Sequence, residues 1–374
     1  MLKSEKEQTL HLSKKYSVQK QISTFSGVCI TLLYLVFMIL LGSNLIKYYL
    51  LFVTTNQYLL IALYLFTFIL LLELFTLPLH FYGGFILEHL FKLSNQTFLG
   101  WIWDELKKFS LSVILLIFLG EVMYLFLRNF PDFWWVYVAI VWIFFSIIMA
   151  KLAPVLIFPL FFKIEPIERE ELREGFLKLA EGTGITIEGV YKINLSKNTK
   201  KANAALAGLG STRRVLLSDT LLDSYSPVEI HSVFAHELGH HVYHHIWKLL
   251  AIGVITSFGG FALCHYVVIN VLTFFGFQFI YDIAVFPLLC IVFAVFGFIL
   301  LPIQNACSRR WERECDKYAI KKTNNPQAFI STMDKLADQN LADRSPNRII
   351  ELLFYGHPPI AKRIEMARGF LSCV

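Results

Sequence analysis

The sequence predicts a mainly α-helical, multi-pass membrane protein that also carries a polar domain. Of its 374 residues, 56% are apolar and only 17% are charged. Soluble chains are typically about 45–50% apolar and about 25% charged. Six stretches are apolar over the roughly 20 residues that a helix needs to cross a bilayer. The 35 phenylalanines also suit lipid-facing helices better than a soluble core.

The six spans fall into two groups along the chain. The last two form a hairpin over residues 249–303, inside a second domain of residues 160–374. Its polar parts, 160–246 and 304–374, total about 160 residues, enough for one compact domain. The first four spans define an N-terminal membrane domain, residues 1–159, and lie near 25–46, 57–79, 109–127 and 134–157.

Basic residues alternate between the two sides of the membrane that this map implies. Five lysines precede the first span, ten basic residues lie within 160–246, and none lies between the last two spans. Because basic loops stay cytoplasmic, both termini and the polar domain are expected to face the cytoplasm. The net charge of +6 is therefore explained by the orientation of the protein in the membrane. We expect a lipid bilayer as partner and no nucleic acid. The six cysteines form no CxxC pair and predict no disulfide framework.

A histidine-rich helix precedes the hairpin, in the stretch FAHELGHHVYHH. Ser226 as N-cap, Pro227 at the first helical position and Glu229 in a capping box predict a helix over 227–246. In a helix, His236 and His240 lie about 40° apart on neighbouring turns, so both imidazoles can reach one ion. Glu237 follows the first histidine. This is an HExxH pattern, whose logic is two zinc ligands and a general base.

The other three histidines of the stretch admit a plainer interpretation. His241, His244 and His245 are interpreted as polar residues at a helix end near a membrane surface. A loose metal-binding tract that uses all five histidines is the rival hypothesis.

A hydrolytic zinc site needs a third protein ligand, and SRRWERECDKYA (308–319) offers one directly after the last span. Glu312 could bind zinc, and Asp316, one turn later, could accept the free N–H of a ligand histidine. The alternative is a charged helix that leaves the membrane with its acids paired to neighbouring arginines. The transmembrane hairpin favours the zinc site, because it returns Glu312 to the side where the histidine helix ends.

These motifs resemble those of the integral-membrane zinc metallopeptidases of the type I CAAX prenyl endopeptidase family. The resemblance rests on HELGHH and SRRxExxxD, and it extends from about residue 25 to the end of the chain. Further similar stretches are LEHLFKLSNQTFLGWIWDELKK (87–108), LAPVLIFPLFFKIEPIE (152–168), KNTKKANAALAGLGSTRRVLLSDTLL (197–222) and YGHPPIAKRIEMA (355–367). Members of that family carry seven spans, one more than the six counted here.

The resemblance implies a zincin-like (gluzincin) catalytic domain with a small sheet, and one Zn²⁺ per chain. It implies that His236, His240 and Glu312 bind the zinc, with Glu237 as general base and Asp316 as the partner of a ligand histidine. His357 would donate a hydrogen bond to substrate or oxyanion, whereas alone it would be interpreted as a turn residue before two prolines. Asn203 and Ala204 would lie on an edge strand that pairs with an extended peptide, although a plain loop residue fits Asn203 equally well.

The expected activity is that of a membrane-embedded zinc endopeptidase acting on membrane-associated peptides or proteins. In a eukaryote, the resemblance points to removal of the C-terminal tripeptide of prenylated proteins in the endoplasmic reticulum membrane. In a bacterium, quality-control cleavage of misfolded membrane proteins is the more natural role. The C-terminus shows no dilysine or KDEL-type signal, which favours a bacterial plasma membrane.

A metal or proton transporter is the alternative from another functional class, and it would use ionisable residues inside the spans. Glu73 and Glu121 are two such acids. They could face a wet interior or form structural pairs, for example with Lys151. The metal-binding set, however, is concentrated in the polar segments, which favours the enzyme.

Overall fold

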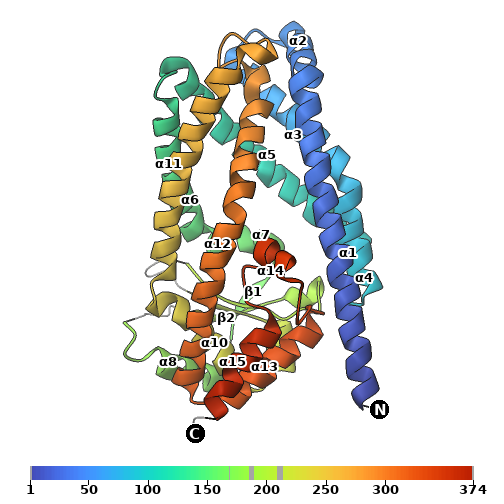
Figure 1. The fold of residues 1–374 in the computed structure, drawn as a ribbon, viewed down its shortest axis with the longest axis vertical. Coiled ribbons are helices and arrows are strands. Elements are labelled where there is room, and N and C mark those ends of the chain that lie inside the picture. Colours follow the sequence, from blue (N-terminus) through green and yellow to red (C-terminus); the bar gives the residue numbers. More distant parts are fainter. Residues whose placement is uncertain (1, 168, 185–188, 209–213, 373–374) are drawn as a thin grey trace.

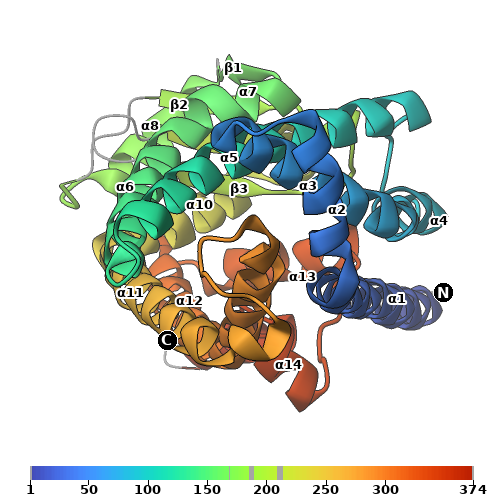
Figure 2. The same ribbon diagram turned by 90° about the horizontal axis from the view of Figure 1, so that it is seen from above.

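The computed structural model describes residues 2–167, 169–184, 189–208 and 214–372. Long helices occupy one end of the molecule, and a small sheet with shorter helices occupies the other, where both termini also lie (Figure 1). Within the described residues, six helices are long and apolar enough to cross a membrane, which confirms the predicted mainly helical, six-span architecture. Seen from above, α1 and α11 lie on opposite sides of the molecule (Figure 2).

Three of the long helices are continued by short π-helical turns. The first predicted span, for example, continues from α1 through one such turn into α2. The elements of this part are α1 (Leu2–Phe37), η1 (Met38–Gly42), α2 (Ser43–Val53), α3 (Gln57–Phe81), η2 (Tyr82–Ile86), α4 (Leu87–Leu90), α5 (Phe98–Asn129), α6 (Trp134–Leu152), η3 (Ala153–Ile157), α7 (Phe158–Phe161), α11 (His245–Val271), η6 (Thr273–Phe275), η7 (Ile283–Val285) and α12 (Phe286–Thr323).

The core of the membrane part is aromatic and also buries polar groups. Tyr64, Tyr124 and Trp134 are fully buried. The Tyr64 hydroxyl hydrogen-bonds Ser43 at 2.6 Å. In contrast, many large apolar side chains point outward, and Phe52 is 74% exposed. A helix bundle with an aromatic core and an apolar exterior is typical of a lipid environment.

Four short strands form the sheet, in the order β1-β2-β4-β3. The central pair β2–β4 is parallel, and the outer pairs are antiparallel. β3 is an edge strand, in register with β4 through Ala204 opposite Leu217. The strands are β1 (Ile164–Pro166), β2 (Gly189–Ile193), β3 (Ala204–Ala207) and β4 (Arg214–Ser218).

Short amphipathic helices complete the polar part, and α10 is its centre. α10 packs along the polar end of α12, where Gly239 allows close approach: a Cβ at this position would lie 3.1 Å from Cα of Cys315. The helices are α8 (Glu170–Ala180), η4 (Leu195–Lys197), α9 (Asp219–Ser224), α10 (Pro227–Val242), α13 (Pro326–Gln339), α14 (Arg348–Phe354) and α15 (Ile360–Leu371).

The histidine-rich helix is shorter than the predicted 227–246. α10 ends at Val242, and the next helix, α11, starts at His245. The break is made by His244, whose φ of +56° lies in the left-handed region. Histidine is one of the residues that adopts this region more often than most. The chain therefore turns before it enters the fifth span.

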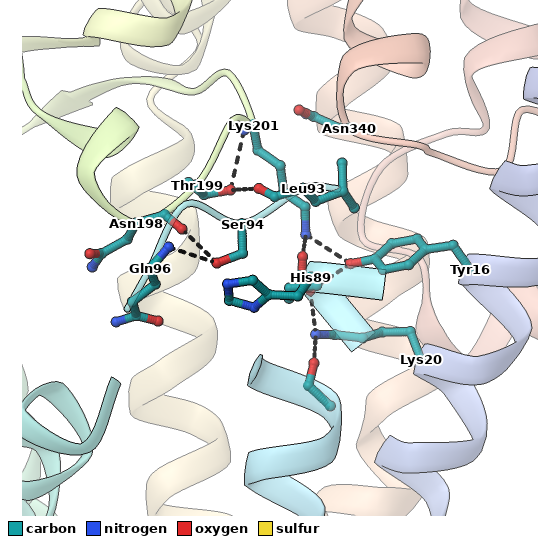
Figure 3. A network of polar contacts seen from close by, with 12 residues as sticks. Tyr16, Lys20, His89, Leu93, Ser94, Gln96, Asn198, Thr199, Lys201 and Asn340 are labelled. Atoms are coloured by element: carbon teal, nitrogen blue, oxygen red, sulfur yellow. Dashed lines mark hydrogen bonds and ion pairs between the residues drawn. The ribbon is translucent and has the colours of Figure 1, made fainter. Parts of the chain in front are cut away.

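The loop between α4 and α5 joins the two parts of the molecule (Figure 3). Ser94 and Thr199 form a β-bridge, and the Lys200 N–H donates to the Leu93 carbonyl at 2.8 Å. Asn198 donates to Asp104 of α5 at 3.0 Å. These bonds hold the segment 198–203, which leads directly into the edge strand β3.

Next to this loop, three polar side chains, Tyr16, Lys20 and Lys201, surround Glu88 and form with it what we call the Glu88 cluster. Lys20 and Lys201 each place Nζ 2.8 Å from a Glu88 carboxylate oxygen, and the Tyr16 hydroxyl donates to Glu88 at 2.7 Å. The Glu88 side chain is only 12% exposed. Glu88 of α4 thus links Lys20 of α1 to Lys201, which precedes β3. Figure 3 shows the two lysines and Tyr16.

Candidate metal centre

The N-terminus of α10 is fixed as the sequence predicted. The Glu229 carboxylate accepts the Ser226 N–H at 2.8 Å, which forms the capping box with Pro227 at the first helical position. The same carboxylate binds Lys335 at 2.7 Å and Ser331 at 2.6 Å, both on α13. Burial alone would raise the pKa of Glu229, but these hydrogen bonds lower it to about 2. The helix is therefore anchored by a carboxylate at one end.

His236, His240 and Glu312 converge from α10 and α12. Nε2 of His236 lies 3.0 Å from one Glu312 oxygen, and Nε2 of His240 lies 3.3 Å from the other. All three ligand atoms lie within 4.8 Å of one another. The transmembrane hairpin thus brings together the two segments that the sequence analysis paired.

The three residues fit a zinc ion. Two imidazoles and one carboxylate are a zinc donor set, and ligand atoms about 2.0–2.1 Å from a tetrahedral ion lie about 3.3 Å apart. The observed nitrogen–oxygen distances of 3.0 and 3.3 Å are close to this spacing. In addition, Oε2 of Glu312 is buried and has no aligned hydrogen bond within the described residues, which leaves its lone pairs available to a cation.

Asp316 supports His236 from the side away from Glu312. Its Oδ1 lies 2.9 Å from Nδ1 of His236, an ion-pair distance without hydrogen-bond alignment. Asp316 is fully buried and is held by Arg363, whose Nε and Nη2 lie 2.9 and 2.5 Å from its two oxygens. Burial opposes protonation of His236, but Asp316 and Glu312 outweigh it and raise its pKa to about 9.

His357 reaches the same carboxylate from the loop between α14 and α15. Its Nδ1 lies 2.8 Å from Oε2 of Glu312, and its side chain is 67% exposed. Arg309 shapes this loop by donating to the carbonyls of Glu351 and Tyr355 at 2.8 and 2.7 Å. Arg309 is one of the arginines that the alternative interpretation, a charged helix leaving the membrane, would pair with acids. It is buried and donates to these carbonyls instead.

The remaining candidates lie around this centre. Glu237 is half-buried on α10, next to His236. Ala204 opens the edge strand β3, and Asn203 precedes it, with its backbone paired to Ser218 through two bonds of 3.0 Å. Residues 209–213 of the stretch 197–222 lie outside the described residues.

His245, interpreted from the sequence as a polar residue at a helix end near a membrane surface, lies at the start of α11 but is buried. His244 is exposed and His241 is half-buried, but His245 is only 1% exposed. The reason is the left-handed turn at His244, which sends the following side chain back toward α10 and α12. The hydrophobic periodicity of the sequence does not predict this left-handed turn, so the burial of His245 could not be predicted either.

The two acids within the spans have different surroundings. Glu73 contacts His80 of the same helix at 3.2 Å, a partner other than the suggested Lys151. Glu121 buries Oε2, which has no hydrogen-bond partner in the part of the chain that the structure describes. Neither acid belongs to the set of ligand atoms formed by His236, His240 and Glu312.

Comparisons with known proteins agree with this geometry. Residues 166–370 match peptidase family M48, and residues 3–163 match the family described as "CAAX prenyl protease N-terminal, five membrane helices". In this chain, the second range holds four of the candidate spans.

Individual relatives point the same way. The "Uncharacterized metalloprotease YhfN" of Bacillus subtilis is 31% identical over 268 residues, which cover 71% of this chain and 63% of that protein. "CAAX prenyl protease 1" of Saccharomyces cerevisiae is 29% identical over 311 residues, covering 77% and 67%. The crystal structure of S. mikatae Ste24p superposes with a TM-score of 0.84 at 26% identity, covering 96% of this chain and 88% of that one. The chain is an integral, multi-pass membrane protein that belongs to peptidase family M48.

Proposed function

We propose that the protein is a zinc endopeptidase in which His236, His240 and Glu312 hold the ion. The observation that carries this proposal is the convergence of the three ligand atoms within 4.8 Å from two helices separated by a transmembrane hairpin. When bound, zinc supplies the Lewis acidity that polarises a peptide carbonyl and favours deprotonation of water.

The side chains around the ligand set supply the other elements of peptide hydrolysis. Glu237 takes the proton of the attacking water and passes it to the leaving amine. His357 reaches the ligand carboxylate with Nδ1, and its exposed ring is available to donate to the oxyanion that develops on the carbonyl. Asp316, held by Arg363, orients the His236 ring.

The edge strand β3 supplies a place for an extended peptide. Within the described residues, β3 pairs along one edge, with β4, so backbone groups on its other edge, beginning at Ala204, can hydrogen-bond a substrate strand. The backbone of Asn203 is bonded to Ser218, so Asn203 would contribute its exposed side chain. The loop contacts around Thr199 fix the start of this strand. In this assignment, residues 1–159 serve as a membrane domain and residues 160–374 carry the chemistry.

The substrates are membrane-bound peptides or proteins. α10 is separated from the candidate span α11 by a two-residue turn, and Glu312 lies on the same helix as the last span, so the centre lies next to the bilayer. Similarity to the yeast CAAX prenyl protease favours prenylated C-termini. Quality-control cleavage of misfolded membrane proteins is the alternative if the host is a bacterium, in whose plasma membrane the catalytic part would face the cytoplasm.

The test compares the wild type with Glu237→Gln, both purified in detergent. Zinc content is measured in each, and each is incubated with a prenylated CAAX peptide and with a misfolded membrane protein. We expect about one zinc per chain in both proteins and cleavage by the wild type alone. Equal cleavage by both proteins contradicts the role of Glu237, and wild type without zinc contradicts the metal assignment. Cleavage of only one substrate separates the two substrate classes.

A further inference from the structure

His245 is a buried polar residue to which the proposed mechanism gives no role. It is the first residue of α11, and its side chain is 1% exposed. Its ring stacks on Trp311 of α12, with 5.3 Å between ring centroids and 19° between planes. A buried imidazole costs free energy unless its nitrogens are bonded, so its partners are informative.

Both ring nitrogens of His245 have partners, and these connect it to a metal ligand. Nδ1 lies 3.2 Å from Nδ1 of His240. Nε2 lies 3.3 Å from a carboxylate oxygen of Glu314 on α12. The thiol of Cys315 also lies 3.5 Å from Nδ1, where its weak S–H can donate to the same lone pair.

This contact exists only because α10 stops at Val242. In a continuous helix, residue 245 would point about 140° away from residue 240, because each residue turns the helix by about 100°. The left-handed His244 reverses the chain locally. As a result, His245 folds back against the outer nitrogen of His240.

The positions of the protons on His245 and His240 can be assigned starting either from Glu314 or from the metal side of His240. Glu314, as a carboxylate, only accepts, so the proton of a neutral His245 lies on Nε2. Its Nδ1 is then an acceptor, and the proton of His240 must lie on Nδ1 to make the 3.2 Å contact a hydrogen bond. This leaves the lone pair of His240 on Nε2, the nitrogen that faces Glu312. Starting from a cation bound at Nε2 gives the same assignment.

We propose that His245 is a positioning residue that, together with Glu314, fixes the tautomer and ring orientation of the metal ligand His240. This inference rests on the proposed ligand role of His240. Each histidine ligand then has a carboxylate behind it. Asp316 contacts His236 directly, and Glu314 acts on His240 through the imidazole of His245.

The test measures metal affinity by competition with a chelator, together with the unfolding temperature of the metal-free proteins. His245→Phe keeps an aromatic ring on Trp311 but removes the acceptor, and we expect zinc affinity to fall about 10- to 100-fold. His245→Asn places an amide oxygen near the position of Nδ1, and we expect most of the affinity to return. Glu314→Ala removes the residue farthest from the ligand in the series Glu314–His245–His240, and we expect it to weaken zinc binding by a smaller factor than His245→Phe does.

His244→Asn is the matched control, because it changes an exposed neighbour and Asn also tolerates the left-handed turn. A second readout is the visible spectrum of the cobalt-substituted protein, which we expect to shift in His245→Phe and to be unchanged in His244→Asn. A purely structural role would lower the unfolding temperature of His245→Phe without the rescue of affinity by His245→Asn.

The outcomes separate this inference from the proposed function. If His240→Ala loses zinc while His245→Phe and Glu314→Ala bind it as tightly as the wild type, the positioning role of His245 and Glu314 is contradicted and the ligand assignment stands. If the wild type itself binds no zinc, the ligand assignment fails.

Discussion

Gly239 of α10 packs directly on Cys315 of α12, so closely that a Cβ on the glycine would lie 3.1 Å from the Cα and 3.2 Å from the Cβ and Sγ of the cysteine. The contact falls between the two histidines on one helix and the two acids on the other. It sets the distance at which His236 and His240 meet Glu312, because both partners are held by backbone and cannot yield as the end of a flexible side chain would.

Gly239→Ala is therefore expected to push α10 away from α12. We expect a loss of about 1–3 kcal/mol in the free energy of unfolding, as for overpacking of a core, and weaker zinc binding. Both are measured by denaturation and by metal titration. Gly253→Ala in α11 is the control, because a Cβ there meets nothing within 4 Å. Equal zinc affinity of Gly239→Ala and the wild type would contradict the spacing argument.

Arg363→Ala is expected to destabilise the protein by about 3–5 kcal/mol, because it leaves the fully buried Asp316 without its cationic partner. The His236 ring loses its fixed support as well, so zinc affinity should also fall. Chemical denaturation and metal titration measure the two effects. Arg368→Ala, an exposed arginine on the same helix, should leave both unchanged, and a similar loss there would show that the effect is not specific to the ion pair.

Glu229 should make stability depend on pH in the acidic range. Its pKa is lowered to about 2, so its contribution is fully present above the ordinary glutamate pKa of 4.5 and is lost as the pH falls through about 2. The linked free energy is about 3 kcal/mol. Unfolding curves between pH 7 and pH 2 measure it, and Glu229→Gln should show a correspondingly flatter pH dependence. Identical pH dependence of the two proteins would show that the capping carboxylate is not responsible.

Glu88→Ala should weaken substrate binding without removing zinc. Glu88 holds Lys201, which lies two residues before Asn203 at the start of the edge strand. We expect KM to rise several-fold while zinc content stays at the wild-type value, measured by steady-state kinetics and metal analysis. Glu105→Gln, which changes a partly buried acid of α5 paired with Lys108, is the control. A fall in kcat at constant KM would place the effect on the chemistry instead of the strand.

The parts that could be predicted from sequence are those governed by local chemistry or by the bilayer. Ser226, Pro227 and Glu229 predict the start of α10, because helix capping depends only on residues close together in the sequence. The hairpin predicts the meeting of Glu312 with the histidine helix, because both of its ends must emerge on one side of the membrane. The residues that could not be predicted depend on turns and long-range packing. The buried state of His245 follows from one left-handed residue, and Arg309 and Arg363 meet their partners across loops that carry no periodic pattern.

The placement of the ligands on either side of the hairpin has a consequence for biosynthesis. A nascent chain that has emerged only as far as the fifth span already contains both histidines of α10, but Glu312 is made about 70 residues after His240. The proposed ligand set is therefore complete only after the hairpin of the last two candidate spans has crossed the bilayer and returned. A chain whose last span has not yet been inserted therefore lacks one of the three proposed ligands, so the proposed centre is complete only in the fully integrated protein.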